Sequence, residues 1–453
     1  MNGVNWETYD EALVKEAAKS VVGHIDPVMM HYIENCVSCA ACETACPYYA
    51  VGEEYGPVNK AENLRKLVRS EVAILPRIFP WLFHSHVPKD AEELNKWAEM
   101  AYRCTNCGLC YVTCPFGIHS GEMIKLVRGF LTKTGRVPTV LKAMIDMEVS
   151  GTYSGIKGFM DLWQSVLKEA EKAIGKELPL DKKGAEYVYL PSLAEAMITP
   201  EAIVSSIKIL DKLGLNWTMP SDPMSIRAPV GALAGDGEAA AAVVKRIYNY
   251  LKEIGPRYVV MSDGGYPYTT YRFDLPRIVG EKPPFKVVHF VELILELVEA
   301  GKAKIIQGDE EVTWHSPCKM GRFAGLIEEP AKLLSMASKN FRKLESHGLF
   351  SRCCGGGNSI ACIVLPTMQF LGKLTGTTMQ VSDEEMNFLK KLEHDMYIAS
   401  KGKIDEIRKS KAKIVASACV GCIHTIRLSS RVHGLDVSVV NIVEVLADKI
   451  EKA

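Results

Sequence analysis

Two cysteine runs with the same spacing constrain this chain more than any other feature of its sequence. Each run reads Cys-x-x-Cys-x-x-Cys-x-x-x-Cys-Pro: the first holds Cys36, Cys39, Cys42 and Cys46, and the second holds Cys104, Cys107, Cys110 and Cys114. Three thiolates at two-residue gaps can wrap one loop around a corner of an iron–sulfur cube, and the fourth, before proline, leaves that corner. The runs therefore predict two cubane [4Fe-4S] clusters.

The fourth cysteine of each run decides which thiols share a cluster. In proteins with two such clusters, that residue ligates the other cluster. We therefore expect one cluster on Cys36, Cys39, Cys42 and Cys114, and the other on Cys104, Cys107, Cys110 and Cys46. The alternative is structural zinc, which takes four ligands and closes locally, leaving no use for a third closely spaced cysteine in each run.

Composition limits where the chain acts and what it binds. Its 453 residues carry 54 basic and 54 acidic side chains, so no global field would recruit nucleic acid. The start, MNGVNWETYDEAL, lacks a secretory pattern, and no run of about eighteen apolar residues occurs. We expect a cytoplasmic protein with reduced thiols, attached to the inner face of a membrane only through a partner subunit.

A third cysteine group lies near the C-terminus, and its pattern is rarer. It consists of Cys318, the run Cys353-Cys354-Gly355-Gly356-Gly357, and Cys419-x-x-Cys422. Adjacent cysteines can serve one cluster if one thiolate bridges two irons in an opened cluster, and the glycines let the backbone approach the metal. The alternative is a mixture of buried core thiols and one zinc site.

Other residues near this group have weaker signals. Cys362 fits no motif, and an inert buried thiol is the simpler interpretation. Four side chains flank the group and offer protons or positive charge to a leaving thiolate, although each is more often a structural polar residue: His315, Lys319, Arg322 and His424.

The chain divides into a helical front and an α/β back. Residues 1–130 carry both cysteine runs among helices, and 131–185 read as a helical connector. Beyond these, β-branched runs alternate with amphipathic helices, which predicts parallel α/β layers. The expected strands are Val188–Leu190, Tyr258–Met261, Val287–Phe290, Val312–His315, Ile414–Ser417 and Val437–Val440, and the expected helices lie near 200–213, 237–254, 330–345, 382–400 and 441–451.

An internal repeat organises the back half. Tyr189-Leu190-Pro191-Ser192-Leu193 resembles Trp314-His315-Ser316-Pro317-Cys318, and the segment from Val259 to Asp263 resembles that from Ile414 to Cys419. We therefore expect two repeated Rossmann-like lobes, 186–305 and 306–453, of which only the second has cysteines. The fold class is multidomain: an α-helical domain with two clusters, followed by an α/β domain of two lobes.

An apolar segment, Glu71–Pro88, separates the two cysteine runs. Pro76 and Pro80 exclude one continuous helix there. The simpler interpretation is a loop packed over the cluster domain, and the alternative is a docking surface for another subunit. Asp90 and Glu93 then form a capping box that starts the helix leading to the second run.

These motifs carry a resemblance to a known family. The front resembles the helical ferredoxin domain of succinate dehydrogenase and heterodisulfide reductase, and Val312–Ala447 resembles the cysteine-rich CCG domain, so the whole layout is similar to the family of the D subunit of heterodisulfide reductase. The resemblance implies that five residues ligate a noncubane [4Fe-4S] cluster at which a disulfide is cleaved: Cys318, Cys353, Cys354, Cys419 and Cys422.

Two departures from the family pattern matter. The first lobe has Leu193, Ser225-Ile226-Arg227, Asp263 and Tyr266 where the second has cysteine motifs, so it is expected to be a scaffold without a cluster. The gap from Cys354 to Cys419 is roughly twice the length usual in the family. We expect an inserted helical element over Gln369–Lys403, with partner docking as a role.

The resemblance implies an oxidoreductase subunit acting on sulfur groups. Electrons would pass through the cubanes to the noncubane cluster, which reduces or forms a disulfide on a small molecule or a carrier protein. The expected partners are other subunits of a redox complex, a flavoprotein or a cytochrome-type membrane subunit. The alternative is an electron-relay subunit of a flavin-dependent glycolate, lactate or glycerol 3-phosphate dehydrogenase, and a third is a metal-free scaffold. Asp236-Gly237 and Gly355-Gly356-Gly357 lack the context of a dinucleotide site.

Overall fold

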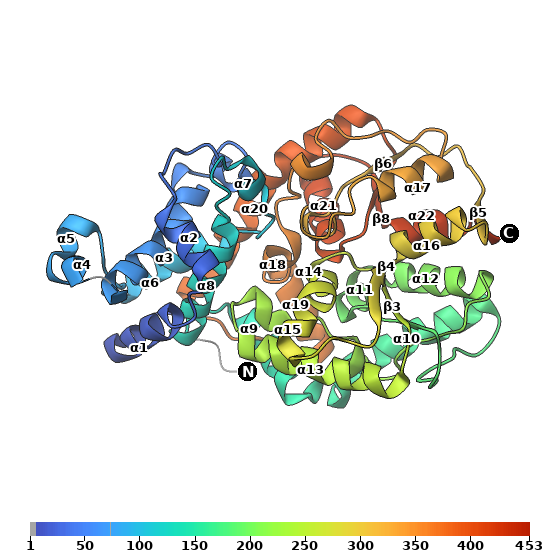
Figure 1. Ribbon diagram of the computed structural model, residues 1–453, viewed down its shortest axis with the longest axis horizontal. Helices are drawn as coiled ribbons and strands as arrows, with labels where there is room; N and C mark the ends of the chain where they lie inside the picture. The colour runs from blue at the N-terminus through green and yellow to red at the C-terminus, as the bar shows by residue number, and fades with distance from the viewer. Residues whose placement is uncertain (1–5, 73) are drawn as a thin grey trace.

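The computed structural model describes residues 6–72 and 74–453. Residues 1–5, part of the start that argues against a secretory signal, and Ala73, within the apolar Glu71–Pro88 segment, lie outside the described residues. Figure 1 shows a helical N-terminal domain on one side and a larger part with helices and small sheets on the other. The protein is therefore multidomain, with its helical domain first, as the sequence predicts.

The N-terminal domain is helical because Asp side chains start its helices and apolar faces pack them together. Asp10, Asp26 and Asp90 each accept a backbone N–H at a helix start. Both cysteine runs lie in the loops that these helices frame. The elements are α1 Glu11–Val22, α2 Pro27–Glu34, η1 Pro47–Ala50, η2 Glu53–Tyr55, α3 Pro57–Val72, α4 Ile74–Ile78, α5 Pro80–Phe83, α6 Ala91–Tyr102, α7 Leu109–Thr113 and α8 Ser120–Lys133.

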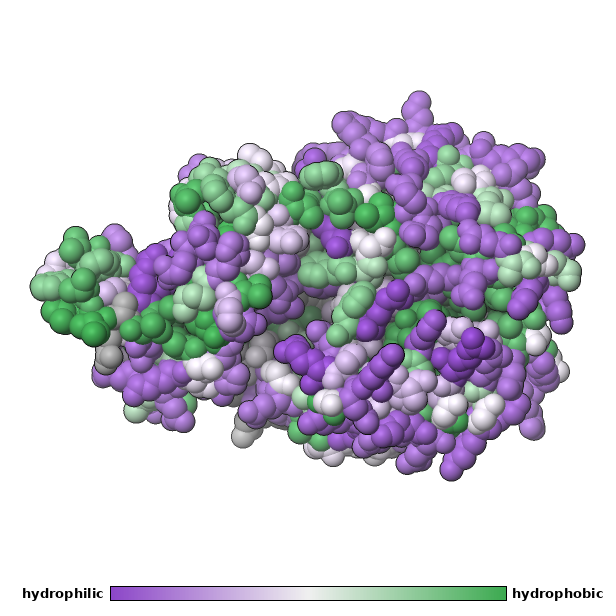
Figure 2. Space-filling model, in the orientation of Figure 1, coloured by the Kyte–Doolittle hydropathy of each residue, from purple (hydrophilic) through white to green (hydrophobic). Residues whose placement is uncertain are grey.

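The apolar segment between the runs forms two short helices, α4 and α5, which are separated at Phe79, directly before Pro80. The expectation that it packs over the cluster domain is wrong. Ile74 is 74% exposed, Trp81 73% and Leu82 67%. Figure 2 shows the resulting apolar patch at the end of the molecule where Figure 1 places α4 and α5. An exposed patch of this kind favours the alternative, a docking surface.

The expected connector is helical and belongs structurally to the second part. It contains α9 Thr139–Ser150, η3 Thr152–Gly155 and α10 Lys157–Ile174. Helix α9 packs on α13 (Gly237–Ile254), and α10 packs on α12 (Pro200–Lys212). Trp163 on α10 is fully buried. These helices are therefore walls of the α/β part and not a free linker.

Two small parallel sheets form the centre of the α/β part. The first has the order β2-β1-β3-β4 and the second β6-β7-β8, all parallel, and an antiparallel β5-β9 pair joins residues near 304 to the C-terminal strand. The six expected strands are present, with bounds within one residue, and β2, β5 and β9 were not expected. The strands are β1 Tyr187–Tyr189, β2 Trp217–Thr218, β3 Tyr258–Met261, β4 Lys286–His289, β5 Ala303–Ile305, β6 Val312–Trp314, β7 Ile414–Ser417, β8 Ser438–Asn441 and β9 Ile450–Lys452.

Helices cover these sheets, and three differ from expectation. The helix expected near 330–345 ends at Ala337, where the chain turns to bring Arg342 alongside β6. The one expected near 441–451 ends at Leu446, because β9 pairs with β5. The one expected near 382–400 runs on to Ser410. The other elements are α11 Leu193–Ile198, η4 Pro223–Ile226, η5 Val230–Leu233, α14 Tyr266–Thr269, η6 Thr270–Asp274, α15 Leu275–Val279, α16 Phe290–Glu299, η7 Lys319–Phe323, α17 Glu329–Ala337, η8 Gly348–Phe350, α18 Gly357–Ala361, α19 Leu365–Thr375, α20 Asp383–Ser410, α21 Val420–Val432 and α22 Ile442–Leu446.

Candidate metal centres

The eight N-terminal cysteines surround two separate cavities, and all fourteen cysteines are free thiols. Each cavity takes three thiols from one run and the fourth from the other. The outer cavity is lined by Cys36, Cys39, Cys42 and Cys114, and the inner one by Cys46, Cys104, Cys107 and Cys110. This grouping is the one that the spacing predicts. That these thiols ligate clusters stays a prediction.

The two cysteine loops share an unusual backbone conformation. Ser38 (φ 53°) and Ala40 (φ 61°) flank Cys39, while Asn106 (φ 52°) and Gly108 (φ 72°) flank Cys107. Non-glycine residues in this left-handed region cost free energy, so the fold must hold them there for a reason. Both loops curl around their middle cysteine in the same way, which suits wrapping around a compact group.

The spacing between thiols argues against single zinc ions in the N-terminal domain. Across residues 6–72 and 74–453, only one set of three ligand atoms lies within the 4.8 Å that a single ion permits: His315, Cys354 and Cys422. The eight N-terminal thiols do not form such a set. Their cavities therefore fit a group larger than one ion, as a cluster is.

Burial makes the thiols of Cys42 and Cys318 depend on a metal for their ionisation. Burial raises the pKa of Cys42 and of Cys318 to about 12, so neither would be a thiolate at neutral pH in the bare chain. Metal coordination deprotonates thiols outright. One positive group is already in place, because the buried Lys60 has its Nζ 3.9 Å from Cys46 Sγ.

The five C-terminal cysteines meet at a third cavity. Cys318 lies at the start of η7, just after β6; Cys353 and Cys354 precede α18; Cys419 and Cys422 lie at the start of α21, after β7. All five line one cavity of about 840 Å³. Cys354 Sγ and Cys422 Sγ are 3.5 Å apart. The structure thus brings together the whole set that the sequence singled out.

The glycines after the cysteine pair let the backbone lie close to other elements. Gly355 has φ 98°, and a Cβ at this position would lie 2.8 Å from the backbone nitrogen of Ser400 on α20. The N–H of Gly355 donates to Cys353 Sγ over 3.4 Å, and the N–H of Gly357 donates to Cys354 Sγ over 3.2 Å. Such donors stabilise negative charge on sulfur, as a cluster site needs.

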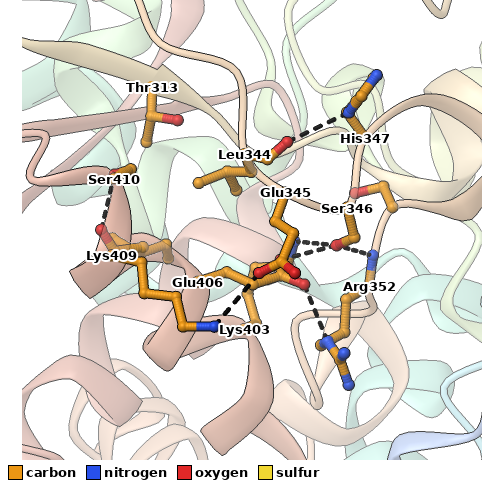
Figure 3. A network of polar contacts seen from close by, with 12 residues as sticks. Thr313, Leu344, Glu345, Ser346, His347, Arg352, Lys403, Glu406, Lys409 and Ser410 are labelled. Carbon is orange, nitrogen blue, oxygen red and sulfur yellow. Dashed lines mark hydrogen bonds and ion pairs between the residues drawn. The ribbon is translucent and has the colours of Figure 1, made fainter.

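A network of polar contacts, drawn in Figure 3, fixes Arg352, the residue directly before the cysteine pair. Arg352, which precedes Cys353, donates from its backbone N–H to Ser346 Oγ and from Nε to Glu406 Oε1. The buried Lys403 donates to Glu406 Oε2 over 2.7 Å. Lys403 and Glu406 belong to α20, so the long helix fixes the position of this loop.

Helix α20 also contacts the N-terminal domain. Arg103 Nη2, one residue before Cys104, lies 2.6 Å from Asp395 Oδ2 on α20. The same helix also contacts α9 of the α/β part, where Thr139 donates its backbone N–H and its hydroxyl to the buried Glu385 carboxylate. The expected insertion at Gln369–Lys403 is thus helical, as α19 and α20, and α20 has an internal bracing role.

The inner cavity and the C-terminal cavity adjoin each other. Thr105 and Asn106 line both, and Thr105 Oγ1 is 3.3 Å from Cys353 Sγ. Arg322 Nε donates to the carbonyl of Cys107 over 2.9 Å, and the buried Tyr48 hydroxyl donates to the carbonyl of Gly355 over 2.8 Å. The second cysteine run is therefore packed directly against the five-cysteine site.

Three of the four flanking polar residues line this C-terminal cavity: His315, Lys319 and Arg322. His315 is buried, its Nδ1 has no hydrogen-bond partner among the described residues, and burial holds its pKa well below the usual range. Lys319 Nζ donates to Asn106 Oδ1 over 2.9 Å. His424 is not among the lining residues, and Cys362 lines a different, neighbouring cavity.

The sequence did not predict the residues that α8 and the first half of the α/β part contribute to the C-terminal cavity. Lys125 and Arg128 from α8, and Tyr266 and Asp274 from the first half of the α/β part, also line the cavity. The only sequence signal was at Tyr266, which aligns with a cysteine position. The basic residues on α8 come from a helix whose pattern shows only an ordinary amphipathic face, so their convergence on the site depends on tertiary packing.

Comparison with known proteins gives these centres a family context. A 4Fe-4S dicluster domain matches residues 32–118, and a cysteine-rich CCG domain matches residues 312–370. The chain is 25% identical to the D subunit of the dihydromethanophenazine:CoB–CoM heterodisulfide reductase of Methanosarcina mazei, over 74% of this chain and 81% of that protein. The chain is therefore similar to this heterodisulfide reductase subunit, and it has a dicluster domain followed by a CCG domain.

Other family relatives are named for quinone chemistry. An Hdr-like menaquinol oxidoreductase iron–sulfur subunit of Archaeoglobus fulgidus is 25% identical over 75% of this chain and 70% of its own length. An EtfAB:quinone oxidoreductase of Syntrophomonas wolfei is 22% identical over 72% of this chain and 48% of its own length. These matches support an iron–sulfur electron-transfer oxidoreductase subunit. Within residues 6–72 and 74–453, no helix combines the length and apolar character that a membrane crossing needs.

Proposed function

We propose that the chain is the catalytic subunit of a heterodisulfide reductase-like complex that reduces or forms a disulfide-type sulfur substrate at its C-terminal cysteine site. One cubane [4Fe-4S] cluster would be held by Cys36, Cys39, Cys42 and Cys114, the second by Cys104, Cys107, Cys110 and Cys46, and a noncubane [4Fe-4S] cluster by Cys318, Cys353, Cys354, Cys419 and Cys422. When bound, these clusters supply one-electron carriers.

One observation carries this proposal: the inner cysteine cavity and the C-terminal cavity share Thr105 and Asn106 as walls. The outer and inner cavities likewise share Ser120. The three sites therefore form a continuous series within one chain. Cys39, at the outer end, is exposed, which makes the outer loop the natural point for electrons to enter or leave.

The residues of the C-terminal cavity suit a sulfur substrate. Reduction of a disulfide takes two electrons and two protons and gives two thiols, so the site needs both electron delivery and positive charge. Thr105 and Tyr48 hold the inner loop against the cysteine pair. Lys319 and Arg322 line the cavity with positive charge, which stabilises a departing thiolate.

Partners would complete the complex. We propose a flavoprotein or a cytochrome-type membrane subunit as the electron partner, which would place this cytoplasmic chain at the inner face of a membrane. The exposed apolar surface of α4 and α5, with Ile74, Trp81 and Leu82, supports the docking of another protein there. The two parallel sheets support the further proposal that 186–305 and 306–453 are Rossmann-like repeats after a 1–130 domain and a 131–185 connector.

Anaerobic purification with iron analysis and electron paramagnetic resonance tests the cluster content. Three clusters correspond to about twelve irons per chain, whereas fewer than about eight would exclude even the two cubanes. Adding an oxidant and a thiol should produce a substrate-dependent signal. Cys354→Ser should remove the substrate-dependent signal and leave both cubane signals. Cys362→Ser, the same change in the neighbouring cavity, should leave the substrate-dependent signal and both cubane signals unchanged. An unchanged signal in Cys354→Ser would refute the site assignment.

Two alternative functions, an electron relay and a zinc site, are each supported by one observation. The relay role draws support from the relative named as an EtfAB:quinone oxidoreductase. Reduced protein mixed with a disulfide should release two thiols per two electrons, whereas a relay would be reoxidised by a quinone analogue without releasing thiol. The zinc alternative draws support from His315, Cys354 and Cys422, whose ligand atoms lie within 4.8 Å. One zinc with only eight irons per chain would favour it.

A further inference from the structure

A second cavity lies beside the C-terminal cysteine site, and the cysteines of that site take no part in it. Its empty volume of about 720 Å³ includes space that is open to solvent. Its walls are mostly apolar and come from α9, α10, α11 and α19, including Met144, Phe159, Met197 and Leu371. Tyr266 lines both cavities, so the two are neighbours.

The position of this cavity follows from the internal repeat. Leu193, Arg227, Asp263 and Tyr266 stand in the first half where the second half has its cysteine motifs, and all four line this cavity. On the proposed repeat, the first half has a hollow at these positions, and the one thiol that lines it is Cys362, which belongs to no cysteine motif. A hollow that persists without a cluster calls for another occupant, because protein interiors otherwise pack closely.

Arg227 is the one strongly polar group here that its neighbours leave incompletely satisfied. Its side chain is 2% exposed, and its Nε and Nη1 have no hydrogen-bond partner among the described residues. Its guanidinium carbon lies 3.2 Å from the centre of the Tyr153 ring. A buried guanidinium with free donors is costly, and its planar fork matches a carboxylate.

The nearby acids do not supply that carboxylate. Glu148 Oε1 is 3.8 Å from Arg227 Nη2, beyond hydrogen-bond distance, while Oε2 accepts the N–H of Val230 over 2.9 Å. Burial raises the pKa of Glu148 to about 8, and its long ion pair with Nη2 leaves Nε and Nη1 of Arg227 without a partner among the described residues. Asp263 already accepts hydrogen bonds from Ser192 Oγ and from the backbone N–H groups of Gly265 and Val420.

We propose that this cavity binds a small apolar monocarboxylate, with its carboxylate on the Arg227 guanidinium and its hydrocarbon body against the apolar walls. The carboxylate takes the Nη1–Nη2 end of the guanidinium, which satisfies the free Nη1–H donor, and the hydrocarbon fills the hollow. This site is distinct from the redox site and does not depend on the sulfur chemistry proposed above. Its position next to Tyr266 places the ligand one side chain away from the C-terminal cysteine cavity.

Calorimetric titration of the anaerobic, cluster-loaded protein with octanoate and octanamide tests the proposal. The two probes match in length and differ in charge. Octanoate is expected to bind, and octanamide to bind about tenfold or more weakly, because a charge-assisted bidentate pair is lost. Equal binding of both probes, or no binding of either, would overturn the proposal.

Variants assign the effect to the cavity. Arg227→Gln should abolish the preference for octanoate with iron content unchanged, whereas Glu148→Gln, which keeps the volume and removes the competing acid, should bind octanoate at least as well as the parent protein. Ala194→Phe, which adds a ring at the cavity wall, should block both probes and provides a second readout if Arg227→Gln misfolds. Octanoate binding that survives both Arg227→Gln and Ala194→Phe would place the ligand elsewhere and refute the assignment.

Discussion

Arg103 and Asp395, which are 292 positions apart in the sequence, form a buried ion pair with Nη2 and Oδ2 2.6 Å apart. Arg103 directly precedes Cys104 of the inner cysteine loop, and Asp395 lies on α20, the helix that also braces the Cys353–Cys354 loop. Both side chains are almost fully buried. The pair therefore joins two of the proposed redox sites through one helix.

Breaking this pair should destabilise the whole assembly. Asp395→Ala removes the closer of the two acids that pair with the buried Arg103 and leaves Glu99 Oε2 3.7 Å from Nη1, so we expect a cost of up to about 3–5 kcal/mol, the range for broken buried pairs. We expect a clear drop in the anaerobic melting temperature and faster proteolysis between the two parts. Asp405→Ala, on the same helix, removes two more exposed pairs, with Lys401 and Arg408, and should change stability by less than about 1 kcal/mol. If the two variants lowered the melting temperature equally, the Arg103–Asp395 pair would not stabilise the contact between the two parts of the chain.

His289 should make stability fall in mild acid. It is fully buried, its Nδ1 accepts the N–H of Val291 and its Nε2 donates to the carbonyl of Ser262, so it is neutral in the fold. Burial lowers its pKa to about 4. The unfolded chain, with a histidine pKa near 6.5, binds more protons between these values, so stability is lost as pH falls from about 6.5 to 4, by roughly 3 kcal/mol in all.

The chain contains its own control for this prediction. Asn441 occupies the matching place after β8: it caps α22 and its Nδ2 donates to the same Ser262 carbonyl over 3.1 Å. His289→Asn should therefore keep the cap and remove the titration. As pH drops from 7 to 5, the melting temperature of the parent protein should fall more than that of His289→Asn. A constant difference would show that His289 does not titrate as described.

The cysteine sites were predictable because metal ligation imposes short spacings that are visible in one dimension. The N-caps at Asp90 and Ser382 were also predictable, since they depend on residues three positions apart. The exposed side of α4 and α5 was not, because an apolar run does not reveal what covers it. Nor was the end of α22 at Leu446, which depends on the pairing of β9 with a strand about 150 residues earlier.

The bracing role of α20 could not be predicted from the sequence for a similar reason. Its sequence shows an amphipathic helix with a good N-cap, and an insertion in this family invites a docking role. The partners of Asp395, Glu385 and Glu406 come from distant segments, and only the folded chain reveals that these acids face inward. The same holds for Arg227, whose unpaired donors have no signature in the sequence.

Lys60 should raise the reduction potential of the inner cluster. Its buried Nζ lies 3.9 Å from Cys46 Sγ and donates to the Arg103 carbonyl over 2.7 Å. Positive charge near a cluster favours the reduced, more negative state. Lys60→Met should lower one midpoint potential by on the order of tens of millivolts in a redox titration. Lys66→Met, on the same helix α3 but over the Trp97 ring, should leave all potentials unchanged.

Paired substitutions can decide whether the fourth cysteines are exchanged between the two runs. If Cys46 belongs with Cys104, Cys107 and Cys110, as the inner cavity suggests, then Cys46→Ser with Cys110→Ser damages one site only. One cubane signal and about four cubane irons should survive. Cys46→Ser with Cys42→Ser damages both sites, so both signals should be lost or altered. Local pairing within each run predicts the reverse, because Cys42 and Cys46 would then share a cluster. The two double variants remove the same number of thiols, which makes each the control for the other.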